Sequence, residues 1–388
     1  MLADLLFVLI AISWVYWLLT LYLIYDFYRA PPAPGDDYRP PVSILKPVRG
    51  LDPEAYENFV SFCQQDYDSF EVLFGVDSPA DPAVPVIERL QRGFPQVSIG
   101  LIIAPAFGTN RKASVLHSLA IQARHEVLVI SDSDCRVTPD YLHRVVAPLR
   151  DDEVGMVTCP YRGEKALTFT ARLEALYIGA TFVPLVLAAR KYITMRLGLG
   201  ATMAVRRSDL ERIGGFAAFA DYLGDDYQLG YRISGLGRRV QLSRYVVACV
   251  LGAATFREQW NREVRWMRNA RVCRPREYPI VPLTFSTPLA VALALVSGFS
   301  RASLAAIVVS IVVRWLVSWL VTGFMGDVES RRTMFWLPLR DMLSAVIWLV
   351  GAAGKKIVWR GETFLLEPDG RLAPLAAIAP KPETVGPG

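Results

Sequence analysis

The feature that most constrains this chain is an uninterrupted apolar run near its start. No charged residue occurs between Asp4 and Asp26. The run between them, Leu5 to Tyr25, is long enough as a helix, at about 1.5 Å per residue, to cross the roughly 30 Å hydrocarbon layer of a bilayer. A cleavable signal peptide is disfavoured, because its apolar core usually has only about 7–15 residues and comes after a basic start. We therefore expect residues 1–26 to form an N-terminal transmembrane anchor.

Apolar runs return in the last third of the chain. Ile280 to Phe299 and Ala302 to Phe324 are each predicted to span the membrane, the second despite Arg314. Met334 to Ala353 is interrupted by Arg340 and Asp341. A crossing there would place the basic residues after it on the outer side, against the positive-inside rule, so an interfacial or re-entrant helix is preferred. Residues 279–354 are thus expected to supply two to three transmembrane or interfacial helices.

The basic residues just after the first anchor predict the orientation. Arg29, Arg39, Lys46 and Arg49 come soon after it, which favours a cytoplasmic location for the middle part of the chain. We expect a multi-pass protein of the inner (cytoplasmic) membrane. Residues 27–41 would be a Pro-rich linker and residues 355–388 a cytosolic tail, weakly ordered after Leu372.

Between residues 42 and 278 the pattern is that of a globular domain. Short β-branched apolar runs predict buried strands at Val42–Leu45, Glu71–Val76, Val97–Ile103 and Val127–Ser131. Helical patterns lie between and after them, at Pro53–Cys63, Val84–Arg92, Arg111–Arg124 and Pro139–Leu149. This alternation predicts an α/β fold with a mostly parallel sheet, whose ligands bind beyond the carboxyl ends of the strands.

One apolar segment inside this domain allows two interpretations. Leu173 to Ala189 contains only one acid, Glu174, and is broken by Pro184. It fits an element at the membrane surface and, nearly as well, a helix of the protein core.

Charge and cysteine usage exclude several classes of protein. The net charge is +5, but no run of five basic residues occurs, which favours juxtamembrane cations and an anionic small molecule over nucleic acid. The five cysteines are an odd number and lie far apart, so neither a disulfide framework nor a zinc site is indicated.

The strongest candidate site is the sequence Asp132-Ser133-Asp134, directly after the last predicted strand. Alternation along an extended backbone points both carboxylates to one side. Two like charges so close favour a cation between them, and hard oxygen ligands suit Mg²⁺ or Mn²⁺, with a diphosphate completing the shell. The alternative is a turn in which the acids cap the next helix.

A second group of candidates comes after another strand and opens a helix. Asp77 and Asp81 come after the strand that ends at Val76, where carboxylates can bind a base or ribose; a plain turn is the alternative. Arg111 and Lys112 lie in the first turn of a helix, where the helix dipole disfavours cations. This placement suggests that Lys112 binds a phosphate, against the alternative of a solvated helix face.

A third group lies further along the chain. In Asp225-Asp226 at a loop-to-helix junction, one acid can serve as a catalytic base. Arg262 and Arg265 are three residues apart, next to Trp266, so both guanidiniums share a helix face and suit a diphosphate. A patch that contacts lipid headgroups is the alternative for the two arginines.

Taken in order, these motifs resemble the ceramide glucosyltransferase family, of the family 2 and family 21 type, with its bacterial relatives that glycosylate hopanoids. The resemblance extends over most of the chain, to Trp359-Arg-Gly361. It is carried by Pro41–Gly50, Phe74–Pro82, Asn110–Lys112, Asp132–Asp134, Gly214–Phe216, Asp225–Tyr227 and Arg262–Trp266.

The resemblance implies a GT-A nucleotide-diphospho-sugar transferase domain over residues 42–278. It implies that Asp132 and Asp134 hold the metal on UDP, that Asp226 is the general base, and that Arg262, Arg265 and Trp266 line the donor and acceptor site. One departure is Ser78, where relatives usually carry an acid. Asp77 lies one place earlier, while Asp81 matches.

The predicted activity is an inverting transfer of a hexose, glucose or N-acetylglucosamine, from a UDP-sugar to a hydroxyl of a membrane lipid. The acceptor would be a ceramide-like sphingolipid or a polyol hopanoid. Alternatives are a polyprenyl-phosphate sugar transferase, a processive polysaccharide synthase and a non-catalytic membrane protein.

Overall fold

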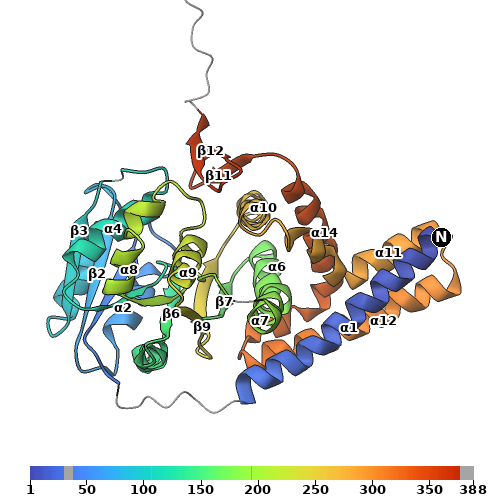
Figure 1. Ribbon diagram of the computed structural model, residues 1–388, viewed down its shortest axis with the longest axis horizontal. Helices are drawn as coiled ribbons and strands as arrows, with labels where there is room; N and C mark the ends of the chain where they lie inside the picture. Colours follow the sequence, from blue (N-terminus) through green and yellow to red (C-terminus); the bar gives the residue numbers. More distant parts are fainter. Residues whose placement is uncertain (30–37, 106, 194, 376–388) are drawn as a thin grey trace, which may run out of the picture.

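The computed structural model describes residues 1–29, 38–105, 107–193 and 195–375. Most of the predicted linker and the end of the predicted tail lie outside these ranges. Figure 1 shows two parts, a globular α/β domain and an elongated bundle of helices that projects from one side of it. A small sheet made from the C-terminal segment lies over the junction of the two parts.

In the described residues, seven strands form the main sheet in the order β3-β2-β1-β4-β8-β6-β9. The first four in sequence are β1 (Val42–Pro47), β2 (Phe70–Val76), β3 (Ser98–Ile103) and β4 (Val127–Ile130), and they pair in parallel. The other three are β6 (Val154–Thr158), β8 (Met203–Arg206) and β9 (Arg239–Leu242). Strand β8 is antiparallel to both β4 and β6, and β9 is parallel to β6. The predicted α/β class with a mostly parallel sheet is confirmed.

Helices connect the strands as the alternating pattern predicts. They are α2 (Ala55–Cys63), α3 (Val84–Gly93), α4 (Arg111–Gln122), α5 (Tyr141–Val146), α8 (Arg207–Arg212) and α9 (Asp225–Gly235). Strand β1 pairs with β2 on one side and β4 on the other. The chain order therefore reverses at β1, and the crevice at such a point is where ligands of α/β sheets bind.

A second sheet and a long helix complete the domain. The sheet has the order β5-β10-β7, from β5 (Cys135–Arg136), β7 (Tyr161–Ala166) and β10 (Val247–Gly252). Helix α10 (Phe256–Cys273) comes after β10 and begins with a capping box between Thr255 and Glu258. These two residues satisfy each other's free backbone N–H groups, which fixes where the helix starts.

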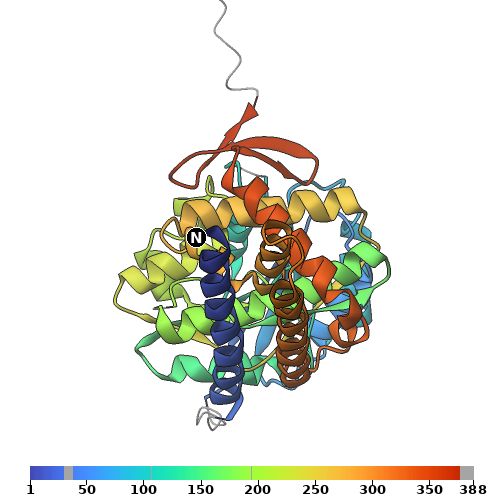
Figure 2. The same ribbon diagram turned by 90° about the vertical axis from the view of Figure 1, so that its right-hand side faces the viewer.

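The membrane bundle is built on α1 (Leu2–Arg29) and α12 (Arg301–Phe324), both long and apolar enough to cross a bilayer. Figure 2 shows the blue α1 running along the orange helices. The Trp14 indole N–H donates to Ser310 Oγ at 2.9 Å, and that of Trp17 donates to the Thr284 carbonyl at 2.9 Å. Because only a third of the apolar window of each helix is buried, their outer faces suit contact with lipid.

The predicted span Ile280–Phe299 is not one straight helix. A 3₁₀ segment (Tyr278–Thr284) and α11 (Ser286–Val296) meet at a bend of 74°. Pro282 lies inside the 3₁₀ segment, and Phe285 has the non-helical angles φ −90° and ψ 59°. A proline cannot donate a helical hydrogen bond, so a break in the helix here has a local cause.

The segment with two interpretations lies inside the protein. It forms α6 (Phe169–Tyr177), a π-helical turn (Ile178–Phe182) and α7 (Val183–Tyr192). The combined segment is apolar enough to span a membrane, but 78% of its apolar window is buried. It therefore packs as a core element between the α/β domain and the membrane helices.

Helix α14 (Leu337–Ala352) carries the two charges that made its location ambiguous. Asp341 forms a bidentate pair with the buried Arg314 of α12, at 2.7 and 2.9 Å. The Arg314 guanidinium also lies 3.7 Å from the centre of the Trp17 ring. The neighbouring Arg340 pairs with Glu263 of α10 at 2.5 and 2.9 Å. Partners on other helices thus neutralise both charges.

We expect Asp341→Ala to lower the free energy of unfolding by about 3–5 kcal/mol, because it leaves the Arg314 charge buried and unpaired. Thermal unfolding in detergent measures the change. Asp369→Ala is the control, since it removes an exposed pair with Arg371 that contributes at most about 1 kcal/mol. Equal stability of the two variants would contradict the prediction.

The C-terminal sheet consists of β11 (Lys356–Trp359), β12 (Glu362–Leu366) and β13 (Leu372–Pro374), in that order. Residues 355–388 were expected to form a tail. Instead, residues 356–374 fold onto the α/β domain and bury Ile357, Phe364 and Leu366 in a small apolar cluster with Leu223 and Leu372. The alternating apolar pattern in this stretch extends over too few residues to distinguish strands from a loop in the sequence.

Candidate active site

A cavity of about 670 Å³ opens at the carboxyl ends of β1, β2 and β4. The loops after these strands form one wall, helices α6 and α10 form the opposite wall, and the tip of the β11–β12 hairpin forms a third. Most predicted site residues line it: Asp77, Lys112, Asp132, Asp134, Asp225, Asp226, Arg262, Arg265 and Trp266. The fold therefore brings together side chains from five separate parts of the chain.

Asp132 and Asp134 leave the end of the fully buried β4. The buried Lys46 holds the turn, since its Nζ donates to the Asp132 carbonyl at 2.6 Å. Burial lowers the pKa of Lys46 to about 8. Burial, together with the nearby charges of Asp132 and Asp52, raises the pKa of Asp134 to about 6. The acids in this corner of the cavity repel one another, as expected of groups that share a cation.

Asp52 is a site residue that no sequence motif indicated. It lies in the loop after β1, and its carboxylate accepts a hydrogen bond from the hydroxyl of Ser133, between the two motif acids. Its position in the loop after a predicted strand was the available signal, but an isolated acid in a Gly-Leu-Asp-Pro loop also fits an ordinary turn.

Helix α4 contributes its first turn, as predicted. The Asn110 side chain accepts from the Ala113 N–H and caps the helix. Lys112 Nζ lies 2.6 Å from Asp132 and 3.1 Å from Asp225. Although burial opposes its charge, Asp132, Asp225 and Asp226 raise the pKa of Lys112. Arg111 pairs with Asp77 at 3.0 Å, so the cations that the helix dipole disfavours are held by carboxylates.

Asp226 lines the cavity and forms no ion pair with the described residues. It opens α9, and its Oδ1 accepts from the Tyr227 N–H at 2.7 Å. Burial, together with the charge of Asp225, raises the pKa of Asp226 to about 6. A carboxylate with such a pKa is suited to accept a proton near neutral pH.

Helix α10 provides the two predicted arginines. Arg262 pairs with the buried Glu174 of α6 at 2.6 Å. Burial, together with the charges of Arg262 and Arg360, lowers the pKa of Arg265 to about 10. Trp266 stacks on Tyr177, with ring centres 6.4 Å apart. Elsewhere on the same helix Glu263 pairs with Arg340, so α10 is fixed to both α6 and α14.

Asp81 is the predicted site residue that does not line the cavity. Its two oxygens accept from the backbone N–H groups of Gly50 at 2.9 Å and Ala83 at 2.8 Å. It thus fastens the loop that carries Arg49 and Asp52. Ser78 lies in the adjacent turn, where its hydroxyl accepts from the Ala80 N–H at 3.2 Å.

The donor set fits a hard divalent cation. Asp132 and Asp134 both offer carboxylate oxygens to the cavity, and the raised pKa of Asp134 reflects negative charge that a cation would offset. Softer donors are also near, because an Asp134 oxygen and the sulfurs of Cys135 and Cys249 lie within 4.8 Å of one another. These cysteines are free and buried.

Comparison with known proteins gives consistent matches. The sequence model of glycosyl transferase family 21 matches residues 5–372. Ceramide glucosyltransferase 1 of Caenorhabditis elegans is 26% identical and covers 98% of this chain and 84% of that protein. Ceramide glucosyltransferase 3 of the same organism is 25% identical over 94% of this chain and 83% of its own length.

Among solved structures, the mannosyltransferase PcManGT of Pyrobaculum calidifontis, in complex with GDP-Man and Mn²⁺, is similar with a TM-score of 0.54. The two share 21% sequence identity, over 91% of this chain and 98% of that one. At this identity the likeness concerns the fold, and it agrees with the expected GT-A architecture.

Proposed function

The chain belongs to glycosyl transferase family 21, and on that premise we propose that it transfers a hexose from a UDP-sugar to a hydroxyl of a membrane lipid. The sugar would be glucose or N-acetylglucosamine. The observation that carries the proposal is the cavity itself, where the half-buried acid Asp226 lines the same space as Lys112, Arg262 and Arg265. A base and a cation cluster are what transfer from a nucleoside diphosphate to a hydroxyl requires.

In the proposed reaction the lipid hydroxyl attacks the anomeric carbon of the sugar. Asp226 accepts the hydroxyl proton, the new carbon–oxygen bond forms, and the bond to the diphosphate breaks on the opposite face. The configuration at the anomeric carbon is therefore inverted. A positioned base of this kind contributes about 10²- to 10⁴-fold to the rate.

The departing UDP carries the charge that the rest of the site stabilises. Lys112, Arg262 and Arg265 surround the space in which it would lie. Each well-placed cation contributes up to about 4 kcal/mol at about 4 Å and an effective dielectric constant of about 20. The three cations together can therefore stabilise the leaving group by more than the base contributes.

Asp132 and Asp134 are the residues that would hold Mg²⁺ or Mn²⁺. When bound, the ion would neutralise charge on the diphosphate. Lys112 lies against Asp132 and keeps that carboxylate in place.

The acceptor is proposed to reach the site from the bilayer. Tyr161, Ile178, Leu251 and Trp266 line the cavity next to Glu174, and α6 and α10 lie between the α/β domain and the membrane helices. This apolar lining and the similarity to ceramide glucosyltransferases support a ceramide-like lipid, with a polyol hopanoid as the other candidate. The proposed location is the inner (cytoplasmic) membrane, with the α/β domain on the cytoplasmic side.

The test is transfer from radiolabelled UDP-glucose and UDP-N-acetylglucosamine to ceramide, polyol hopanoid and polyprenyl phosphate in detergent. Mass spectrometry of membrane lipids, with and without the protein, identifies the product. We expect a glycolipid formed through a lipid hydroxyl. A product on polyprenyl phosphate, or a polymer, would replace this proposal with one of the alternative activities.

The rate should depend on pH through Asp226. Because the pKa of Asp226 is raised to about 6, we expect kcat/KM to be constant at neutral pH and to fall as the pH decreases below about 6, where the base is protonated. A profile from about pH 5 to about pH 8 measures this. A profile that stays flat to the acidic end would exclude Asp226 as the base.

A further inference from the structure

The tip of the C-terminal β11–β12 hairpin forms part of the cavity wall. Val358, Trp359, Arg360, Gly361 and Glu362 all line it. The hairpin comes from the far end of the chain and reaches the α/β domain from above α10 in Figure 1. It brings to the site a guanidinium, that of Arg360, which has no role in the reaction described above.

Partly exposed ion pairs hold the hairpin tip. Glu362 binds Arg49 at 2.9 Å and Arg111 at 3.0 Å, and both arginines belong to the α/β domain. Arg265 of α10 lies over the Trp359 ring at 5.0 Å. The tip is thus attached to the loop after β1, to the start of α4 and to α10. These three segments carry the other cationic side chains of the site.

The turn at the tip places Arg360 in an unfavourable backbone conformation. Trp359 pairs with Glu362, so the hairpin loop consists of Arg360 and Gly361 alone. Both have positive φ angles, 49° and 83°. Two-residue turns of this kind strongly prefer Asn, Asp or Gly, which adopt positive φ at little cost. An arginine with positive φ is an exception, and such exceptions concentrate at functional sites.

Arg360 is also poorly neutralised by the protein. In the described part of the chain its ion pair is with Asp52, at 3.5 Å from both terminal nitrogens. Arg265 has no ion pair among the described residues, and its buried Nε has no hydrogen-bond partner there. Arg360 is one of the charges that lower the pKa of Arg265. A cation with one long ion pair next to a cation with none forms a site for an anion.

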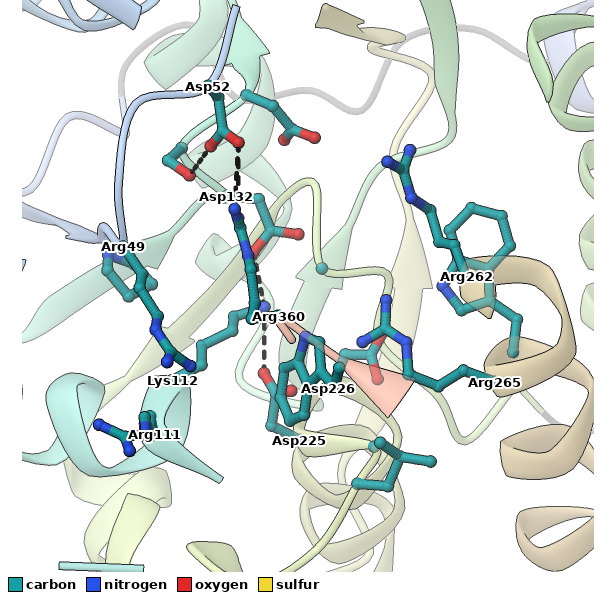
Figure 3. A pocket seen from close by; sticks show the side chains of 18 of the residues that line it. Arg49, Asp52, Arg111, Lys112, Asp132, Asp225, Asp226, Arg262, Arg265 and Arg360 are labelled. Atoms are coloured by element: carbon teal, nitrogen blue, oxygen red, sulfur yellow. Dashed lines mark hydrogen bonds and ion pairs between the residues drawn. The ribbon is translucent and has the colours of Figure 1, made fainter. Parts of the chain in front are cut away.

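Figure 3 shows where this anion would lie. Arg360 extends toward Asp52 near Asp132, with Arg49, Arg111 and Lys112 on one side of the view and Arg262 and Arg265 on the other. Asp52 connects Arg360 to the metal motif, because it also accepts from Ser133. Arg360 therefore reaches the space between the proposed metal ligands and the α10 arginines.

We propose that Arg360 is a further donor-binding residue, which the C-terminal hairpin brings to the diphosphate of the nucleotide sugar. The inference rests on the proposed function for the identity of the ligand. The Arg360 guanidinium would exchange its long contact with Asp52 for hydrogen bonds to phosphate oxygens, while Glu362 keeps the hairpin in place. The segment after the last membrane helix is then part of the active site.

The test measures binding of UDP, UMP and uridine to the full-length protein in detergent, by calorimetry with Mg²⁺ present. Arg360→Gly is the informative variant, because glycine favours the turn and removes the charge. We expect it to unfold at the same temperature as the wild type or higher, and to bind UDP about tenfold or more weakly. UMP, which lacks the second phosphate, should lose less than UDP, and uridine should be unaffected.

Two further variants separate charge from structure. Arg360→Lys keeps a cation and should recover part of the affinity for UDP. Arg371→Ala is the matched control, because this arginine lies in the same small sheet but does not line the cavity, and it should bind UDP as the wild type does.

Unchanged UDP affinity in Arg360→Gly would overturn the proposal, as would an equal loss for uridine. Failure of the wild type to bind UDP would overturn both this proposal and the proposed donor. Normal UDP binding by the wild type without transfer to any lipid would count against the proposed acceptor only.

Discussion

Asp226→Asn is expected to bind UDP-sugar about as tightly as the wild type and to transfer the sugar about 10²- to 10⁴-fold more slowly. The amide has nearly the shape of the carboxylate and still accepts from the Tyr227 N–H. It cannot take a proton from the lipid hydroxyl. Calorimetry with the UDP-sugar and single-turnover transfer to lipid separate the two effects.

The neighbouring acid provides the comparison for this variant. Asp225 contacts Lys112 at 3.1 Å, so Asp225→Asn should weaken binding of the diphosphate through Lys112 and reduce transfer less. Asp140→Asn removes an exposed acid that pairs with Arg144 and should behave as the wild type. If Asp226→Asn lost donor binding and transfer to the same extent, Asp226 would be a binding residue and another group the base.

Asp134→Ala is expected to reduce kcat/KM by about 10²-fold or more, because it removes a proposed ligand of a cation that contributes several kcal/mol to charge stabilisation. The loss should be accompanied by weaker Mn²⁺ binding, which electron paramagnetic resonance detects without turnover. Removal of divalent cations from the wild type with a chelator should produce a similar loss, restored by Mg²⁺ or Mn²⁺.

A second variant tests which donors near Asp134 bind the cation. Cys249→Ser removes one of the sulfurs that lie near the Asp134 carboxylate. If the ligands are the hard carboxylates, this variant should keep the Mn²⁺ affinity of the wild type. Loss of Mn²⁺ binding in Cys249→Ser but not in Asp134→Ala would mean that the cysteine sulfurs bind the cation. That result would contradict the proposed role of the Asp-Ser-Asp motif.

The sequence was most informative where the determining interactions are local. The four parallel strands were predicted close to their observed bounds, because each is a short buried apolar run that ends at Gly, Pro or an acid. The acids and cations just after them were identified for the same reason, since parallel strands deliver their carboxyl ends to one edge. Asp81 comes after such a strand as well, but its carboxylate oxygens accept hydrogen bonds from backbone N–H groups. The spacing of residues in the sequence does not reveal these bonds.

The sequence by itself therefore determined which apolar segments must be buried in the bilayer or in the protein core. It also determined the order in which charged motifs come after strands. Tertiary structure alone decided that Arg314 pairs with Asp341, that Glu263 pairs with Arg340, and that the C-terminal hairpin covers the cavity. These contacts join residues far apart in the chain. Their strength depends on burial and orientation, which no local pattern of residues records.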